Sequence, residues 1–470
     1  YEIGSGLVGS EMCIRDRVNI MNDYRISKYI KKVFETPSDR FSEWFGYYNY
    51  DTLTSNHRKL LCNRIAEDGV PPRADLKVEV GYYEIPFGEW HHVGFSDSWN
   101  WQQGCMAQWL NDDEIIYNTS ENNHHIAIIY DTRTGNDRKI DWAVYGIMPG
   151  GKKSIALDME RAHWCRAYHY QSVKDKSKDG SIFEGDGIFE IDLVSNTRRR
   201  IISIQDILSL DPKPYFTKAK HWLEHIMINQ DGTKFCVLHR FSSVTNVYSY
   251  KTRLIVIDAS TLEMQSIDGW ENTQWSHFGW NGNDFAIYAY PTREKVNEKD
   301  FEPDDKIKSG PFQLRYKPKF SMTLFVKMIA RNVLPTRALL KMKGGITTYQ
   351  YYTQKQNKKY CLQRVFDVDP FLTDGHPSFT PDGRYMITDT YPDKYHCQRL
   401  YVYDLQTSKY LLLGAFNAYY DKNPASCDLH PKLSRDGMTV VVDSAHDQKH
   451  HMLVLDLDWN LIKKQISQYE

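Results

Sequence analysis

Histidines recur at one position of a repeated phrase in this chain, directly before an apolar run and a turn. The clearest copy is DGHPSFTPDGRYMITDTYPD, residues 374–393, with His376 at its head. Further copies are headed by His221, His225, His277 and His430, and Asp428 precedes the last of these by two residues. Imidazoles and carboxylates that converge from several repeats suit manganese, zinc or iron. The alternative is that each histidine bonds to the backbone of its own repeat.

The elements that must position these residues are predicted to be short strands. Apolar and polar residues alternate within each run, and turn signals such as Pro-Asp-Gly separate the runs. The runs group into seven sets of four, which predicts an all-β fold, a seven-bladed β-propeller of four-stranded blades. The first set opens with residues 45–51 and the last closes with residues 461–467, so we expect no blade to need a strand from the other terminus. A β-sandwich is the alternative all-β fold.

Two insertions interrupt the pattern, both between the second and third strands of a set. They cover residues 159–186 in the third blade and residues 291–345 in the fifth. In a propeller, these loops and the starts of the innermost strands lie on one face, so the histidines above are expected at the mouth of the central channel. The basic, partly amphipathic segment 318–343 predicts either a helical cap or a contact with a membrane surface or a protein partner.

The termini and the composition limit the other possibilities. Residues 1–17 resemble a translated sequencing adaptor, so residues 1–20 are set apart as a tail and residues 21–470 are expected to form a single domain. A short helix is predicted near residues 24–34, with no apolar signal-peptide core. The 59 Lys and Arg balance the 60 Asp and Glu, which gives no general attraction to nucleic acid. Scattered cysteines favour reduced thiols and agree with a cytoplasmic location. A monomer or small homo-oligomer is expected.

Four stretches carry a resemblance to a known family. They are HWLEHIMINQDGTKFCVLHR, WSHFGWNGNDFAIYAY, DGHPSFTPDGRYMITDTYPD and CDLHPKLSRDGMTVVVDSAHD. They resemble the repeats of oligogalacturonate lyases and of related propellers, among them ulvan lyases and TolB-like proteins with WD40-type repeats. The resemblance implies a cytoplasmic enzyme that binds manganese at the channel mouth and cleaves an acidic, uronate-containing oligosaccharide by β-elimination.

The same resemblance implies a set of metal ligands. His277 and His430 match two histidine ligands of the family. Asp428 stands where the family has another histidine, and the position of the family's glutamine ligand falls near residues 424–425, which cannot supply a ligand side chain. His376 is the expected substitute. The predicted set is therefore His277, His376, Asp428 and His430, holding a divalent ion that is expected to be manganese.

β-Elimination also needs a base and groups that stabilise charge. Removal of the proton α to a uronate carboxylate builds negative charge on that carboxylate, which a divalent ion or an arginine stabilises. His225 resembles the family's active-site histidine and is the predicted base. Arg240 is assigned to charge stabilisation and Tyr168 to protonation of the leaving group, although the family's catalytic arginine has no clear match here. Each of these could instead be an ordinary loop residue.

Substrate contacts are predicted from polar and aromatic residues on the same face. WNWQQGC, residues 99–105, offers an indole for stacking and two amides, although blade-to-blade packing explains the tryptophans equally well. The predicted substrate-binding residues are Trp101, Gln102, Gln103, Arg166, Tyr391, Arg399 and His446. Two other functions stay open. One is a non-catalytic propeller that binds glycans or a protein, and the other is a metal-dependent hydrolase that uses the same site.

Overall fold

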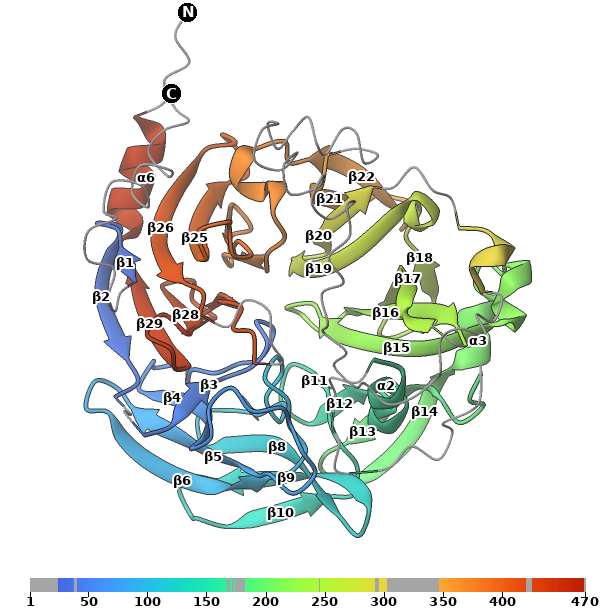
Figure 1. The fold of residues 1–470 in the computed structure, drawn as a ribbon, viewed down its shortest axis with the longest axis horizontal. Helices are drawn as coiled ribbons and strands as arrows, with labels where there is room; N and C mark the ends of the chain where they lie inside the picture. Colours follow the sequence, from blue (N-terminus) through green and yellow to red (C-terminus); the bar gives the residue numbers. More distant parts are fainter. Residues whose placement is uncertain are drawn as a thin grey trace, which may run out of the picture. The chain divides into compact units, whose positions relative to one another are not determined.

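The computed structural model describes residues 24–37, 40–166, 170, 173, 182–244, 246–291, 296–301, 346–419 and 425–468. Their strands form seven antiparallel sheets, which confirms the predicted seven-bladed β-propeller (Figure 1). Contacts within the chain divide it into two compact units, which meet in sequence at Ala143/Val144 and again at Asp374/Gly375. The first unit holds the first, second, sixth and seventh blades, and the second unit holds the third, fourth and fifth.

In the first unit, each blade contains a run of consecutive strands, and blades six and seven each add one strand from the start of the chain. The first blade contains β3 (Ser42–Trp44), β4 (Lys59–Ile65), β5 (Val78–Glu84) and β6 (Glu89–Ser96), and the second contains β7 (Gln108–Trp109), β8 (Glu114–Glu121), β9 (His124–Asp131) and β10 (Asp137–Ile140). The sixth contains β23 (Ser378–Phe379), β24 (Tyr385–Asp389), β25 (Cys397–Asp404) and β26 (Tyr410–Asn417), and the seventh contains β27 (Lys432–Leu433), β28 (Thr439–Ser444) and β29 (His451–Leu457).

In the second unit, the third blade contains β11 (Gly146–Ile147), β12 (Lys153–Ala156), β13 (Gly187–Asp192) and β14 (Thr197–Ser203). The fourth contains β15 (Ala219–Ile228), β16 (Lys234–Ser243), β17 (Asn246–Asp258) and β18 (Met264–Ser266), and the fifth contains β19 (Thr273–Asn281), β20 (Asp284–Pro291), β21 (Thr348–Gln354) and β22 (Tyr360–Val365). The helices here are α2 (Met159–Arg166), α3 (Ile204–Ser209) and the 3-10 turns η1 (Pro214–Thr217), η2 (Trp270–Asn272), η3 (Glu298–Phe301) and η4 (Asp369–Leu372).

The two insertions interrupt blades three and five, as predicted, between β12 and β13 and between β20 and β21. Segment 318–343, which carries the predicted membrane or partner contact, lies outside the described residues, as do residues 1–20. Among the residues that the structure describes, no helix combines the length and apolar character needed to cross a bilayer.

The seventh blade is closed by the N-terminal end of the chain, which corrects two sequence-based predictions. Residues 24–34 were predicted to be helical, but they contain β1 (Arg25–Ile26) and β2 (Ile30–Glu35). β2 pairs with β29 as the outer strand of blade seven, and β1 pairs with β26 of blade six. The predicted independence of each blade is therefore wrong, because the free edge of β29 captures a strand from the start of the chain.

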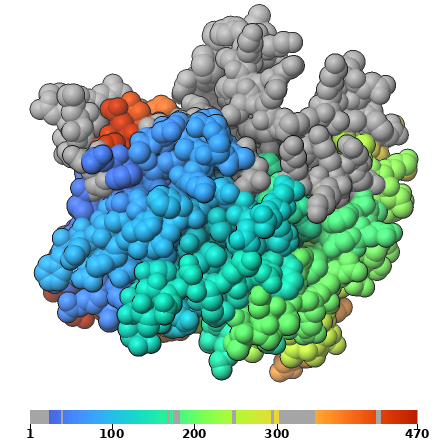
Figure 2. All heavy atoms as spheres, turned by 90° about the horizontal axis from the view of Figure 1, so that it is seen from below, coloured from blue at the N-terminus to red at the C-terminus, as the bar shows by residue number. Residues whose placement is uncertain are grey.

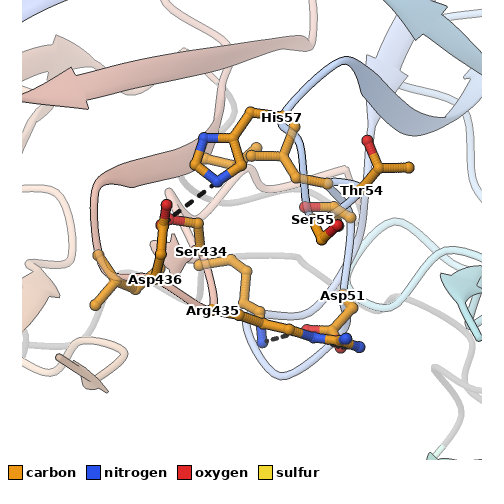
Figure 3. A pocket seen from close by; sticks show the side chains of 12 residues that line it. Asp51, Thr54, Ser55, His57, Ser434, Arg435 and Asp436 are labelled. Atoms are coloured by element: carbon orange, nitrogen blue, oxygen red, sulfur yellow. Dashed lines mark hydrogen bonds and ion pairs between the residues drawn. The ribbon is translucent and has the colours of Figure 1, made fainter. Parts of the chain in front are cut away.

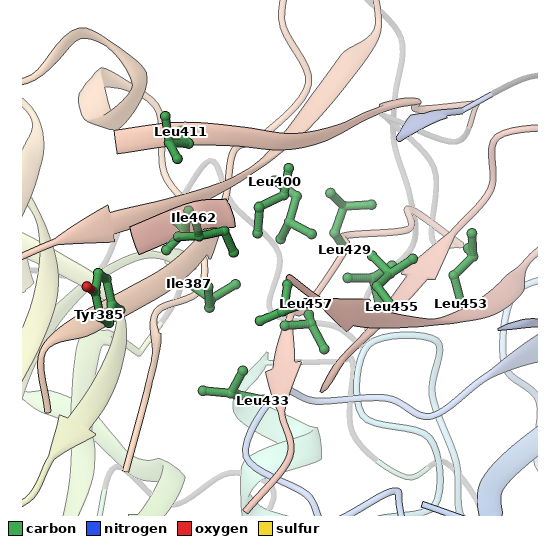
Figure 4. Close-up of a cluster of buried hydrophobic side chains, with 14 of the residues drawn as sticks. Tyr385, Ile387, Leu400, Leu411, Leu429, Leu433, Leu453, Leu455, Leu457 and Ile462 are labelled. Atoms are coloured by element: carbon green, nitrogen blue, oxygen red, sulfur yellow. The ribbon is translucent and has the colours of Figure 1, made fainter. Parts of the chain in front are cut away.

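Residues 461–467 were predicted to be the last strand, but they lie in helix α6 (Trp459–Ser467). The edge of β29 that such a strand would have joined is already paired with β2. Asp458 caps the helix by accepting a bond from the Leu461 N–H. Ile462 and Ile466, one turn apart, are buried in the core of blades six and seven (Figure 4).

The core of the first unit lies between neighbouring sheets. One cluster of buried aliphatic side chains belongs to blades six and seven, and a second, rich in tryptophan, belongs to blades one and two. In β28 all six residues are buried, because an inner strand is covered on both faces. In the space-filling view, the blue and cyan atoms of blades one and two form a continuous surface (Figure 2).

Candidate functional site

Three predicted metal ligands meet in the first unit. One ligand atom each from His376, Asp428 and His430 lies within 4.8 Å of the other two. The rings of His376 and His430 meet edge to face, with their centroids 4.4 Å apart. Both histidines are almost fully buried, and Asp428 is partly exposed. The loops that precede β23 and β27 carry these residues, at the start of the innermost strands of blades six and seven.

Asp389, at the end of β24, binds His376 at two points. Its Oδ1 accepts the backbone N–H of His376 at 2.6 Å, and both of its carboxylate oxygens lie 3.0 Å from the His376 ring nitrogen Nδ1. Gly375 makes this approach possible, because a Cβ atom there would stand 2.0 Å from the Asp389 carbonyl oxygen. In the Asp-Gly-His sequence, the glycine thus allows the backbone to pack closely against Asp389, and the histidine supplies the candidate ligand.

Two tyrosines that the sequence did not single out form an aromatic wall beside the pair of histidines. Tyr48 lies with its ring centroid 5.1 Å from His376, and Tyr47 lies 5.1 Å from His430. Residues 45–51 were predicted to be a strand, but β3 ends at Trp44 and these residues form a turn. The missed signal is the glycine in FGYY, because Gly46 has a φ of +112° and lets the chain turn.

The turn that carries the tyrosines is held from blade seven. The carboxylate of Asp443 accepts the N–H groups of Phe45 and Gly46, at 3.1 and 3.4 Å. Burial raises the pKa of Asp443 well above its usual value, against the opposing effect of these two bonds. The buried carboxylate of Asp443 therefore fixes the backbone of the turn that carries Tyr47 and Tyr48.

His430 has an unusual backbone conformation, which it shares with residues at the same place in two other blades. Its φ is +45°, and those of His225 and Met106 are +54° and +56°. Each of these residues stands six positions before an aspartate of the following turn. A left-handed conformation at a residue other than glycine costs about 1–3 kcal/mol and concentrates at functional sites. The repeated sequence pattern therefore favours a left-handed backbone turn, and this turn sets the position from which each of these side chains extends.

The residue types at this site fit a divalent ion. Two imidazoles and one carboxylate are a nitrogen and oxygen set that suits manganese, zinc or iron. A carboxylate bonded to the other nitrogen of a ligand histidine, as Asp389 is to His376, is a usual companion of such sites. A second group, Glu84, Glu89 and His91, lies on the exposed β5–β6 hairpin, where acidic side chains gather without needing an ion.

His277, the fourth predicted ligand, belongs to the second unit. Its Nδ1 lies 3.1 Å from Oδ1 of Asp374, and the Tyr290 hydroxyl donates to Oδ2 of the same carboxylate at 2.6 Å. His277 and Asp374 are both buried. Burial, followed by the charge of Asp374, raises the pKa of Tyr290 far above its ordinary value. This tyrosine therefore stays protonated and acts as a fixed hydrogen-bond donor to Asp374.

The two predicted catalytic residues of the fourth blade contact one buried carboxylate. Arg240 binds Glu224 at 2.5 Å, and Nε2 of His225 lies 3.6 Å from the same carboxylate. The indole of Trp222 donates to the other oxygen of Glu224 at 2.6 Å. Arg240 also stacks over Tyr250, with the guanidinium carbon 4.7 Å from the ring centroid. Glu224, the carboxylate that contacts both His225 and Arg240, was not predicted from the sequence.

A second pair of histidines is buried in the same blade. Nδ1 of His221 lies 3.0 Å from Nε2 of His239, and Nε2 of His221 lies 2.8 Å from the Phe216 carbonyl oxygen. Burial, reinforced by nearby arginine charges, lowers the pKa of His221 to about 4 and that of His239 well below its usual value. Both rings are therefore neutral at pH 7, which suits packing rather than anion binding.

The predicted sugar-stacking segment is largely buried. Trp101 is 4% exposed, stacks on His450 at 4.5 Å between ring centroids and donates its indole N–H to the Val70 carbonyl. Gln103 is buried, and Gln102 is partly exposed. Packing within the first unit accounts for Trp101, and Gln102 is the member of this segment that solvent reaches.

The remaining predicted contacts are dispersed. Tyr391 lies with its ring centroid 6.0 Å from that of His376, so it is close to the metal-binding group. Arg399 pairs with Asp393 at 2.9 Å, and His446 lies 3.4 Å from Glu35 at the end of β2. Tyr168 lies outside the described residues, and the side chain of Arg166, in α2, does too.

A pocket that the sequence did not predict lies between residues 51–57 of blade one and the β27–β28 turn of blade seven (Figure 3). Its volume is about 300 Å³. Asp51 accepts bonds from Arg435 and pairs with Lys432, while His57 lies 3.4 Å from Asp436. Because Asp51 of the first blade contacts both Lys432 and Arg435 of the seventh, the lining of this pocket ties the first blade to the last.

Comparisons with known proteins agree with this fold. No protein-family model matches the chain, and no curated protein sequence matches it. A solved oligogalacturonate lyase in complex with manganese has a TM-score of 0.58 at 12% identity, over 94% of this chain and 98% of that one. The oligogalacturonate lyase of Vibrio parahaemolyticus has a TM-score of 0.56 at 12% identity, with the same coverage. At 12% identity, this likeness shows only that the chain shares the propeller fold of these lyases.

Proposed function

We propose that this protein is a divalent-metal-dependent lyase that cleaves uronate-containing oligosaccharides by β-elimination. The observation that supports this most is the convergence of His376, Asp428 and His430, with Asp389 bonded behind His376. Because the lyase of similar fold was solved with manganese, manganese is the first ion to test. The cytoplasmic location and the acidic oligosaccharide substrate belong to the same proposal.

The reaction breaks two bonds at neighbouring carbons of the uronate. The proton α to the carboxylate goes to a base, its electron pair forms a carbon–carbon double bond, and the glycosidic oxygen leaves from the β carbon. A bound divalent ion would neutralise the charge that develops on the carboxylate. Three residues of this chain, His376, Asp428 and His430, would hold that ion.

His225 is the proposed base. Its Nε2 lies 3.6 Å from the Glu224 carboxylate, and a neutral ring nitrogen of His225 would accept the substrate proton. Glu224 would also stabilise the imidazolium that forms. The role of Arg240 changes accordingly. Its contact with Glu224 supports a function in fixing that carboxylate rather than direct contact with the substrate.

The experiment that tests this function offers the purified protein a panel of uronate oligosaccharides with added Mn²⁺. Each reaction is followed both by the absorbance of an unsaturated uronate and by the appearance of new reducing ends. Elimination gives both signals in equal amounts. New reducing ends without the absorbance would identify a hydrolase and overturn the lyase. Binding of an oligosaccharide with neither signal would identify a non-catalytic glycan-binding propeller.

A further inference from the structure

Two of the predicted ligand histidines have the same relation to a buried carboxylate. In the first unit, Nδ1 of His376 lies 3.0 Å from both oxygens of Asp389, and in the second unit, Nδ1 of His277 lies 3.1 Å from Asp374. His225 differs, because its Nε2 faces Glu224. The carboxylates of these pairs are almost fully buried.

The identity of the bonded nitrogen fixes the tautomer of each ring. A carboxylate only accepts hydrogen bonds, so the nitrogen that faces it must carry the proton. His376 is therefore the Nδ1–H tautomer, and its Nε2 keeps a lone pair. The same reasoning gives Nε2 the lone pair in His277. Two of the three histidines predicted to bind metal, His277 and His376, thus share one tautomer.

Asp389 binds His376 through the backbone as well as through the imidazole ring. The backbone N–H of His376 donates to Oδ1 at 2.6 Å, so the carboxylate is held by both the main chain and the side chain of one residue. Gly375 lets the two segments approach closely, since a Cβ at this position would overlap the Asp389 carbonyl. The carboxylate and the imidazole therefore have little freedom to move relative to each other.

We propose that Asp389 is a positioning residue that locks His376 as the Nδ1–H tautomer and thereby keeps Nε2 available as the donor atom for a metal ion. The metal-binding half of this proposal rests on the function proposed above, whereas the tautomer does not. Partners of this kind change metal affinity by about 10–100-fold when they are removed. Asp389 itself does not need to touch the ion or the substrate.

The first measurement uses metal-free protein labelled with ¹⁵N in histidine. Long-range ¹H–¹⁵N correlations distinguish the protonated ring nitrogen, and the His376 signals are assigned by their loss in His376→Asn. We expect Nδ1–H in the wild type and in Asp389→Asn, because the amide oxygen can still accept. In Asp389→Ala we expect the Nε2–H form to dominate. An Nε2–H wild type, or an unchanged tautomer in Asp389→Ala, would overturn the proposal.

The second measurement is calorimetric titration with Mn²⁺. Asp389→Ala is expected to bind about 10–100-fold more weakly than the wild type, and Asp389→Asn is expected to lie between them. Asp382→Asn, in the β23–β24 turn of the same blade, is the control and is expected to bind as the wild type does. An Asp389→Ala variant that binds Mn²⁺ as tightly as the wild type and Asp382→Asn do would refute the metal-binding half.

Two further outcomes separate this proposal from the proposed function. If the wild type binds no Mn²⁺, the proposed function fails, and the tautomer of His376 in the metal-free protein still decides the role of Asp389. If Asp389→Ala does not fold, the tautomer of His376 in the wild type decides the role of Asp389. In that case the Nε2–H form in the wild type overturns the proposal, and the Nδ1–H form supports it.

Discussion

The carboxylate of Asp51 accepts two hydrogen bonds from the guanidinium of Arg435, at 3.1 and 2.6 Å, although 384 positions of sequence separate them. Lys432 lies 3.1 Å from the same carboxylate. These contacts join the loop of the first blade to the turn of the seventh. They reinforce the closure that β2 makes at the other edge of the seventh blade.

Asp51→Asn is expected to lower the free energy of unfolding at pH 7 by about 1–2 kcal/mol, since this ion pair is partly exposed. Burial alone would raise the pKa of Asp51, but Lys432 and Arg435 outweigh it and lower the pKa below its ordinary value. The stabilisation is therefore present above pH 4 and is lost as the pH falls through the lowered pKa. Urea unfolding should show a gap between wild type and variant at pH 7 that narrows toward pH 2. Exposed Asp137→Asn serves as the control, and no gap at pH 7 would contradict the role of Asp51.

Deletion of residues 1–37 removes the outer strand of blade seven. The side chains of Ile30 and Phe34 pack against the core clusters, and losing both is expected to cost about 3 kcal/mol. The exposed edge of β29 should also promote association. Thermal unfolding and light scattering measure the two effects. Deletion of residues 1–20 is the matched control and is expected to leave both unchanged, whereas equal stability of the two truncated proteins would mean that β2 does not close the blade.

The buried histidines of blade four predict acid sensitivity. Burial lowers the pKa of His221 to about 4, so the unfolded chain binds a proton near pH 6.5 that the folded chain does not. Stability is therefore full above pH 6.5 and falls toward pH 4, by about 3 kcal/mol for this group. His221→Gln should show a shallower fall of the unfolding free energy over this interval, whatever its stability at pH 7. The exposed His124→Gln should keep the wild-type slope, and an unchanged slope in His221→Gln would be evidence against this explanation.

The proposed base can be separated from the metal ligands. His225→Asn is expected to keep wild-type Mn²⁺ affinity and to reduce the elimination rate about 10²–10⁴-fold. Arg240→Met should instead lower stability by about 3–5 kcal/mol, because it leaves Glu224 buried without its cationic partner. Adding Glu224→Gln to Arg240→Met should restore part of that loss. If His225→Asn eliminated at the wild-type rate, another residue would have to be the base.

The strands were predictable because their signals are local. Many of the apolar runs alternate with a period of two, and they end at turns such as the one at Asp382–Gly383, so neither feature depends on distant partners. The closure of blade seven by β2 could not be predicted from such local signals. The edge that β2 fills belongs to β29, more than 400 positions away, and residues 24–34 carry a pattern that also fits a helix.

The candidate site could likewise be predicted only in part. His376, Asp428 and His430 could be named from their place in the repeat, and the structure brings these three together. The roles of Asp389 and Glu224 could not be predicted, because each becomes a partner of histidine only through strand pairing and burial. Tyr47 and Tyr48 were assigned to a strand because alternation in FGYYNYD concealed the turn at Gly46.

Calorimetric titration of metal-free protein with Mn²⁺, in the wild type, His376→Ala, Asp428→Ala and His430→Ala, tests the proposed metal site most directly. We expect one ion per chain in the wild type and a large loss of affinity in each variant, with His124→Gln unchanged. Circular dichroism and thermal unfolding check that the variants are folded. A wild type that binds no divalent ion, or three variants that bind as tightly as the wild type, would contradict the proposed metal site.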